Sequence, residues 1–174
     1  CPYFKMISRA MSRCITVREE YDRNEHNRKE IEWWKLNQFD QNLKEFKRVR
    51  NKLDFNDMIN GLIEKDLPDF KAIFIDEAQD LSKMQWHMAK TIWQKTTDSF
   101  IAGDDDQAIF RWAGADVDSF IAQEGQMLPL QQSYRIPAKV HGLAMGIINK
   151  IKTRINKTWQ PKTHQGALSR YYDF

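Results

Sequence analysis

One face of the segment from 18 to 52 carries apolar residues at helical spacing. These residues are Leu36, Phe39, Leu43 and Phe46, which recur every three or four positions. The segment contains no Gly or Pro, so the pattern predicts an amphipathic helix. A basic cluster follows at Lys44, Lys47, Arg48, Arg50 and Lys52. Because charge runs on helices usually face solvent, we interpret this cluster as a solvated helical face.

Capping residues predict where further helices begin. Asp54 suits the N-cap of a helix over 55–63, and Ser82 suits the N-cap of the next helix. The apolar face of that next helix consists of Met84, Met88, Ile92 and Trp93. We expect these side chains to lie in the core. Pro137 suits the first turn of a last helix, whose apolar positions continue to Ile155.

Short apolar runs between these helices predict strands. AIFID (72–76) is rich in β-branched and aromatic residues and predicts a buried strand. Residues 100–102 predict a second strand, and MLPL (127–130) predicts a weaker third one. Because strands alternate with helices, we expect an α/β fold with a largely parallel sheet flanked by helices.

Composition limits the class of protein. The 174 residues include 41% hydrophobic and 29% charged residues, which is ordinary for a folded protein and excludes a low-complexity chain. No apolar run approaches the roughly 20 residues that span a bilayer, so we expect no membrane association. Two cysteines are too few for a disulfide framework, which favours a reducing cytoplasm. The first residues lack Met and an apolar signal core, and we expect a piece of a larger protein.

The net charge of +3 hides a strong asymmetry along the chain. Residues 66–127 carry a net charge of −7, whereas residues 128–174 carry +7. Such an asymmetry favours a site for cations or phosphates, although accidental clustering gives the same composition.

Chemically active residues follow each predicted strand. These are Asp76 and Glu77, then 104–107, then Tyr134 and Arg135. Ligands of parallel α/β sheets bind beyond the carboxyl ends of the strands. Two carboxylates can hold Mg²⁺ and activate water, Gln107 can position a phosphate oxygen, and Arg135 suits phosphate. These groups fit phosphoryl transfer from a nucleotide, and the same acids also fit a two-metal nuclease.

Phe110, Arg111 and Trp112 stand together directly after the second acidic group. An aromatic side chain beside a cation can stack on a nucleobase while the cation holds the phosphate backbone. The alternative for Trp112 is packing in the core, which is common for tryptophan.

Three segments resemble motifs of one family. IDEAQDLS (75–82), AGDDDQAIFRWAGAD (102–116) and LQQSYRIP (130–137) resemble motifs II, III and IV of the UvrD/PcrA/Rep-type superfamily 1 DNA helicases. LDFNDMI (53–59) resembles motif Ic, and RINKTWQP (154–161) with Gly166 is similar to the start of the second RecA-like domain. The resemblance covers roughly 53–170 and implies a partial RecA-like fold of the P-loop NTPase type. It also implies three parts. They are a helical lead-in over 1–52, which would be part of a 1B-like insertion, the end of domain 1A over 53–135, and the start of domain 2A over 136–174.

The resemblance also implies residue roles. The metal ligands would be Asp76 and Glu77, and Glu77 would also be the base that activates water. Gln107 would contact the γ-phosphate, Tyr134 would stack on adenine, and Arg135 would stabilise the transferred phosphoryl group. Phe110, Arg111 and Trp112 would bind single-stranded DNA or a single-strand/double-strand junction. The implied cofactors are ATP and Mg²⁺, and the implied activity is ATP-driven translocation with duplex separation.

Two departures from the family pattern limit the expected activity. Ala113 stands where many members carry arginine. The phosphate loop GxxxxGK[ST] is absent, because no two of the seven glycines have its spacing. Without that loop the phosphates lose most of their contacts, so we expect the chain alone to be inactive as an ATPase. The alternative function is an ATP-independent module that binds single-stranded DNA.

Overall fold

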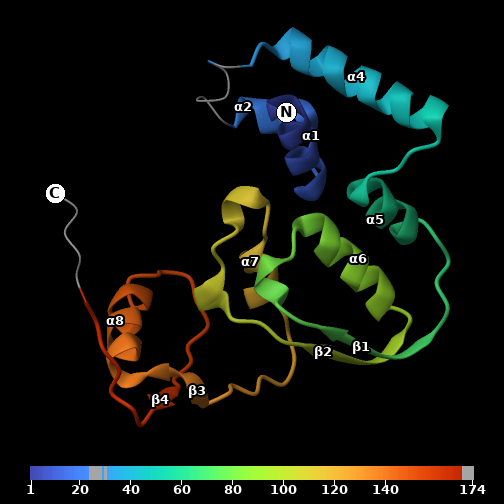
Figure 1. The fold of residues 1–174 in the computed structure, drawn as a ribbon. Helices are drawn as coiled ribbons and strands as arrows, with labels where there is room; N and C mark the ends of the chain where they lie inside the picture. Colours follow the sequence, from blue (N-terminus) through green and yellow to red (C-terminus); the bar gives the residue numbers. More distant parts are fainter. Residues whose placement is uncertain (24–28, 30, 170–174) are drawn as a thin grey trace. The chain divides into compact units, whose positions relative to one another are not determined.

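Helices and short parallel strands alternate along the chain in the computed structural model (Figure 1). The structure describes residues 1–23, 29 and 31–169. The chain divides into two compact units, Cys1–Phe120 and Ile121–Phe174, and each is described by itself.

The first unit begins with helices α1 (Pro2–Ser12), α2 (Val17–Asp22) and α4 (Trp33–Arg50). Their buried contacts form one hydrophobic cluster, which consists of Met6, Ile7, Tyr21, Ile31 and Leu36. The predicted amphipathic helix is confirmed as α4, with Leu36 buried and Phe39 and Leu43 packed against the cluster. Phe46, at the far end of the predicted stripe, is exposed.

Helices α5 (Phe55–Ile63) and α6 (Lys83–Trp93) begin where the capping residues predict. Asp54 and Ser82 each form a capping box, in which the side chain accepts a hydrogen bond from the backbone N–H three residues later. On α6, Met84 is buried as expected, whereas Met88, Ile92 and Trp93 are half-buried. Trp86 and Ala89, outside the predicted face, are buried.

Strands β1 (Phe70–Ile75) and β2 (Thr96–Ile101) pair in parallel, with Ile75 opposite Ile101. This confirms the predicted parallel pairing. The prediction that the first strand is buried is wrong: Phe74 and Phe100 stack on each other with ring centroids 4.8 Å apart, and both rings are exposed. On the other side of the pair, Ile75 and Ile101 pack against Trp86 and its neighbours. Alternate residues of a strand point to opposite faces, so one face is covered and the other is open.

Three short 3-10 turns and a short helix complete the first unit. They are η1 (Ala78–Asp80), η2 (Asp105–Gln107), η3 (Arg111–Ala113) and α7 (Val117–Ile121). The turns η1 and η2 directly follow β1 and β2, so the segments between strand and helix are tightly wound.

The second unit contains β3 (Gln132–Pro137), α8 (Ala138–Ile148) and β4 (Gln160–Lys162). The predicted strand over 127–130 is wrong, because this segment has no regular structure and Leu130 is 91% exposed. Pro129 cannot donate a backbone hydrogen bond to a partner strand. The strand lies further along the chain and pairs in parallel with β4, with an irregular register between Gln132 and Pro137.

Helix α8 ends earlier than the apolar pattern predicts. The predicted helix reaches Ile155, whereas α8 ends at Ile148 and is capped by the backbone N–H of Asn149. Gly142 and Gly146 lower the helix propensity of this segment, and no side chain of α8 is buried. Without burial, packing does not prolong the helix.

These elements confirm an α/β fold with short parallel sheets. The RecA-like assignment and the three predicted domain boundaries remain predictions. Among the described helices, none combines the length and apolar character needed to cross a membrane.

Candidate functional site

Asp76 and Glu77 stand at the carboxyl end of β1, and both are exposed. The Asp76 Oδ1 atom accepts a hydrogen bond from the Glu77 backbone N–H at 2.9 Å. Glu77 has a left-handed backbone, with φ 50° and ψ 41°, which is uncommon for a residue other than glycine. This conformation ends the strand abruptly and begins η1, so the two carboxylates lie at a sharp turn.

Gln79 joins this turn to the end of β2. Its side chain is 2% exposed. The Nε2 atom donates to Glu77 Oε2 at 2.7 Å, and the Oε1 atom accepts from the Asp104 backbone N–H at 2.9 Å. The backbone N–H of Ala78 also donates to the carbonyl of Ala102, at 3.0 Å. The two strand ends are therefore held together by a buried amide and by the backbone.

Gly103 has no side chain, and this allows Gln79 to lie close to the backbone at the end of β2. A Cβ atom at residue 103 would lie 2.7 Å from Gln79 Oε1 and 2.9 Å from Phe120 Cζ. Both distances are shorter than real contacts of a Cβ atom, so a side chain at 103 would displace the bridge.

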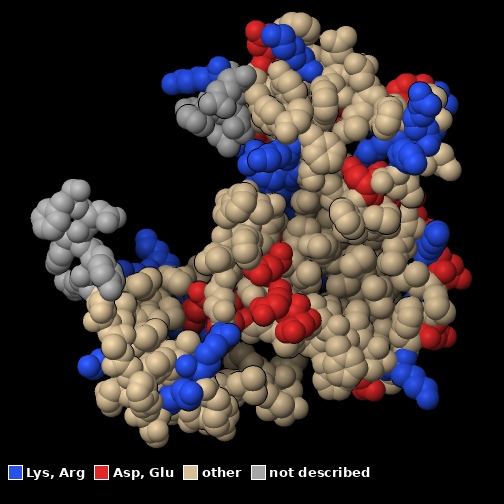
Figure 2. Space-filling model, in the orientation of Figure 1, with Lys and Arg blue, Asp and Glu red and all other residues tan. Residues whose placement is uncertain are grey.

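The acidic group after β2 is folded onto itself. The Asp104 side chain accepts from the Asp106 backbone N–H at 3.2 Å, and Gln107 Nε2 donates to Asp104 Oδ2 at 2.6 Å. Carboxylate oxygens of Asp104, Asp105 and Asp106 lie within 4.8 Å of one another. Figure 2 shows acidic side chains gathered at the surface near the ends of β1 and β2. Oxygen donors of this kind suit a hard divalent cation such as Mg²⁺.

The structure thus brings three of the predicted site residues to one region of the first unit. Glu77 is connected to Gln79, Gln79 to Asp104, and Asp104 to Gln107. Asp76 precedes Glu77 at the same turn. This connected set is the geometric core of the candidate site.

The aromatic segment lies on the surface of the same unit. Trp112 is 70% exposed and Phe110 is also exposed, so packing of Trp112 in the core is excluded. The Arg111 guanidinium donates to both carboxylate oxygens of Asp118, at 2.8 and 3.2 Å. A phosphate that binds Arg111 would therefore compete with Asp118.

Backbone contacts attach the aromatic segment to the turn after β1. Ser82 and Ala115 form an isolated antiparallel bridge, and the Asp116 N–H donates to the Leu81 carbonyl at 2.8 Å. A pocket of about 180 Å³ lies beside this attachment and is lined by Asn56, Asp80, Ser82, Gln85 and Phe110, among others. Polar and aromatic groups therefore share one hollow next to the exposed rings.

Tyr134 and Arg135 belong to the second unit and lie within β3, rather than after a strand as predicted. The Tyr134 side chain is 82% exposed, and Arg135 is exposed as well. The Arg135 backbone N–H donates to Ser133 Oγ at 3.3 Å. Both side chains are open to solvent in their own unit.

The basic cluster at the end of α4 is largely paired with acids. Lys47 Nζ contacts Asp54 Oδ2 at 2.5 Å and Asp57 Oδ2 at 2.7 Å, and Arg48 pairs with Glu45. Desolvation by partial burial raises the pKa of Asp54, but the hydrogen bond and charge of Lys47 outweigh it and leave that pKa lowered. Figure 2 shows blue side chains at this end of α4 beside red ones. Lys44 and Arg48 are exposed, as expected of a solvated helical face, whereas Lys47 is mostly covered.

Comparison with known families decides the relationship. The sequence pattern of the family described as UvrD/REP helicase N-terminal domain matches residues 4–127. The chain belongs to this helicase family.

Individual relatives agree with the family assignment. ATP-dependent DNA helicase PcrA of Bacillus subtilis is 28% identical over 135 residues, which cover 69% of this chain and 18% of the relative. ATP-dependent DNA helicase srs2 of Schizosaccharomyces pombe is 32% identical over 133 residues, which cover 70% of this chain and 15% of the relative. DNA helicase II of Haemophilus influenzae is 32% identical over 101 residues, covering 56% of this chain and 14% of the relative. The chain spans less than a fifth of each of these relatives.

The family match and the motif resemblance cover different ranges. The helicase-family match starts at residue 4, so it includes most of the helical lead-in, which the motifs from 53 onward leave out. It ends at 127, before Tyr134 and Arg135. The roles of those two residues rest on their own motif.

Sequence reasoning missed the bridging role of Gln79. The residue stands inside the IDEAQDLS segment, but its spacing to Asp104 along the chain gives no sign of contact. The one signal was the position of this glutamine, beside Ala78 in a turn between a strand and a helix. A side-chain amide that is buried there must form hydrogen bonds.

Proposed function

We propose that the chain is a segment of an ATP-dependent DNA helicase that translocates along single-stranded DNA. The observation that carries this proposal is the hydrogen-bonded series Glu77, Gln79, Asp104 and Gln107, which connects the ends of two parallel strands. Acids and amides at this edge of a sheet suit a nucleotide bound with a divalent cation. The names of the relatives support the same activity.

The donor chemistry fits MgATP. Asp76 and Glu77 offer exposed carboxylate oxygens, which are the ligands that Mg²⁺ prefers. When bound, MgATP supplies the phosphoryl group that is transferred to water. Glu77 would accept a proton from that water at its carboxylate. The hydrogen bond that Gln79 Nε2 donates to Glu77 Oε2 would fix the orientation of this carboxylate.

Gln107 and Arg135 would act on the phosphate charge. The Gln107 amide is oriented by Asp104, and its remaining hydrogen-bonding capacity suits a phosphate oxygen. Arg135 has a planar cationic fork that suits a phosphoryl group, and exposed Tyr134 would stack on adenine. These two roles remain those implied by the motif LQQSYRIP.

The DNA strand would bind over the exposed aromatic segment. Phe110 and Trp112 present open rings on which bases can stack. The bridge between Ser82 and Ala115 attaches this segment to the turn that carries Asp76 and Glu77. Movement at the nucleotide turn would therefore reach the DNA-binding rings through a few backbone bonds.

The test uses the complete product of the gene. Replacing Glu77 by Gln should lower DNA-stimulated ATP hydrolysis about 10²-fold to 10⁴-fold, because the general base is lost. Glu45→Gln is the matched control, since Glu45 is an exposed acid on α4 that pairs only with Arg48 among the contacts described. Equal rates for the wild type and Glu77→Gln would contradict the role of Glu77.

The exposed rings of Phe110 and Trp112 support a second candidate, a module that binds single-stranded DNA without ATP. The same complete product separates the two candidates. Oligonucleotide binding without any ATP hydrolysis would favour the binding module, whereas DNA-stimulated hydrolysis would favour the helicase.

A further inference from the structure

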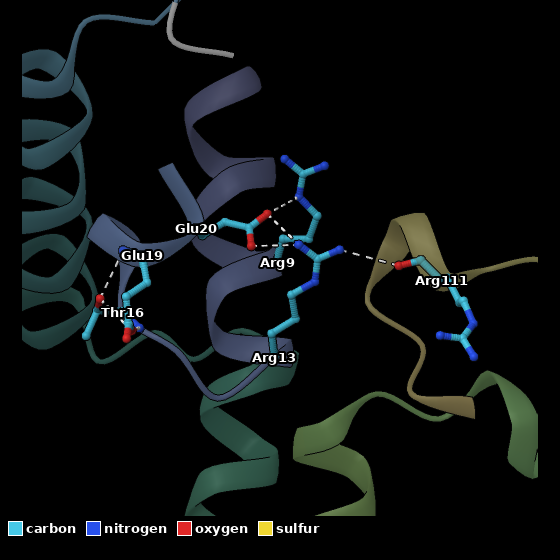
Figure 3. Close-up of polar contacts among 6 residues, drawn as sticks. All are labelled: Arg9, Arg13, Thr16, Glu19, Glu20 and Arg111. Atoms are coloured by element: carbon cyan, nitrogen blue, oxygen red, sulfur yellow. Dashed lines mark hydrogen bonds and ion pairs between the residues drawn. The ribbon is translucent and has the colours of Figure 1, made fainter. Parts of the chain in front are cut away.

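A buried ionic group links the first two helices to the aromatic segment. Glu20 of α2 has a side chain that is 1% exposed, and its carboxylate contacts two arginines (Figure 3). Arg9 Nε lies 2.9 Å from Glu20 Oε1, and Arg13 Nη1 lies 2.8 and 2.7 Å from the two carboxylate oxygens. A buried carboxylate needs such partners, so Glu20 holds the guanidinium group of Arg13 in place.

Arg13 has a second contact, which reaches the aromatic segment. Its Nη2 atom donates to the backbone carbonyl of Arg111 at 3.4 Å (Figure 3). A guanidinium group can do this because its donors diverge in a rigid plane, so one nitrogen serves Glu20 while the other reaches the carbonyl.

The contacted carbonyl belongs to the peptide that joins Arg111 to Trp112. A peptide group is planar, so a contact that restrains this oxygen also restrains the Cα atom of Trp112. The same oxygen accepts the Gly114 N–H at 3.2 Å, which closes the turn η3. Arg13 therefore contacts the peptide group from which the exposed tryptophan projects.

Packing brings α1 to the same turn independently of the hydrogen bond. Gly114 has φ 115°, and a Cβ atom there would lie 3.4 Å from Ser12 Cβ. Ser12, Phe110 and Gly114 also line the same pocket. The end of α1 thus lies directly against the aromatic segment.

We propose that Arg13 is a positioning residue that holds Trp112 in the orientation that stacks on a DNA base. The inference rests on the proposed function, because it assumes that Trp112 contacts DNA. It assigns the helical lead-in a role in DNA affinity through Glu20 and Arg13, which act on Trp112.

The experiment measures binding of a fluorescent oligo(dT) to the 174-residue chain by anisotropy at fixed salt. Trp112→Ala should weaken binding about tenfold, the effect of one lost base stack. Arg13→Gln should weaken it about threefold to tenfold, the effect of one misdirected contact. Arg9→Gln is the matched control, since it also leaves Glu20 with one arginine, and it should change affinity less than about twofold.

A double-mutant cycle separates positioning from general stability. If Arg13 acts through Trp112, Arg13→Gln should have almost no further effect in a Trp112→Ala background. Arg13→Lys keeps a cation for Glu20 but loses the fork, so it should melt like the wild type and bind DNA like Arg13→Gln.

The outcomes are distinguishable. Equal losses for Arg9→Gln and Arg13→Gln, or a loss that persists without Trp112, would overturn the positioning role and leave the proposed function intact. An affinity that Trp112→Ala does not change would remove the DNA contact itself. Wild-type affinity in Arg13→Lys would show that charge, and not the fork, is what matters, which also overturns the inference.

Discussion

The two compact units of this chain differ in how their residues are held. The first unit has two hydrophobic clusters and a buried amide that connects two strand ends. Among described residues 121–169 of the second unit, none is buried. Candidate residues of the first unit are therefore fixed by the unit's own contacts, whereas Tyr134 and Arg135 stand on elements without a core of their own.

The largest expected effect concerns the core of the first unit. Trp86→Ala removes a side chain that is 1% exposed and should lower the free energy of unfolding by about 3 to 5 kcal/mol. Leu143→Ala in α8 is the control in the second unit, where the side chain is 55% exposed, and should cost less than about 1 kcal/mol. Urea titrations followed by circular dichroism measure both. Similar losses of unfolding free energy in the two variants would contradict the difference in burial between the two units.

A smaller effect is expected at the glycines. Gly103→Ala places a Cβ atom 2.7 Å from Gln79 Oε1 and should cost about 1 to 3 kcal/mol. Gly142→Ala in α8 meets nothing within 4 Å and should stabilise by about 0.5 to 1 kcal/mol, because alanine favours the helix. Thermal melts compare the two variants. A neutral Gly103→Ala would argue against the close approach of Gln79.

The buried amide gives a related prediction. Gln79→Leu keeps most of the volume but removes the Oε1 atom that accepts from the Asp104 N–H, which should cost about 1 to 3 kcal/mol. Hydrogen exchange at the Asp104 amide should also become faster, because the bond that protects it is lost. Unchanged exchange at Asp104 would contradict the bridge. Gln85→Leu, which removes a capping side chain of α6, controls for loss of an amide elsewhere.

The smallest expected effect depends on pH. Asp54 caps α5 and pairs with Lys47, so Asp54→Ala should cost about 1 kcal/mol at neutral pH. The pKa of Asp54 is lowered in the folded state, so its contribution is present above its ordinary pKa and is lost as pH falls through the folded value. The difference between wild type and variant should shrink as the pH falls below about 4. Urea midpoints at several pH values measure this difference, and a constant difference would contradict the ion pair.

Local signals in the sequence predicted α4, α5, α6 and the two paired strands of the first unit, but not α1, α2 or α7. Asp54 and Ser82 mark helix starts because their side chains cap backbone N–H groups within three residues. The parallel pairing of the two strands also follows from strands that alternate with helices. The second unit was predicted less well, because MLPL is apolar without forming a strand and α8 stops where nothing buries it.

For the candidate site too, some features follow from the sequence and others only from the tertiary structure. The sequence by itself identified the candidate residues, namely the acids after two strands and the rings of Phe110 and Trp112, because strand ends and apolar runs are read from neighbours along the chain. Only the tertiary structure decided that Gln79 connects Glu77 to Asp104, and that Arg13 reaches the carbonyl of Arg111, 98 positions away. Such contacts depend on where distant segments meet in space, and hydrogen-bond geometry at that scale is set by packing rather than by local pattern.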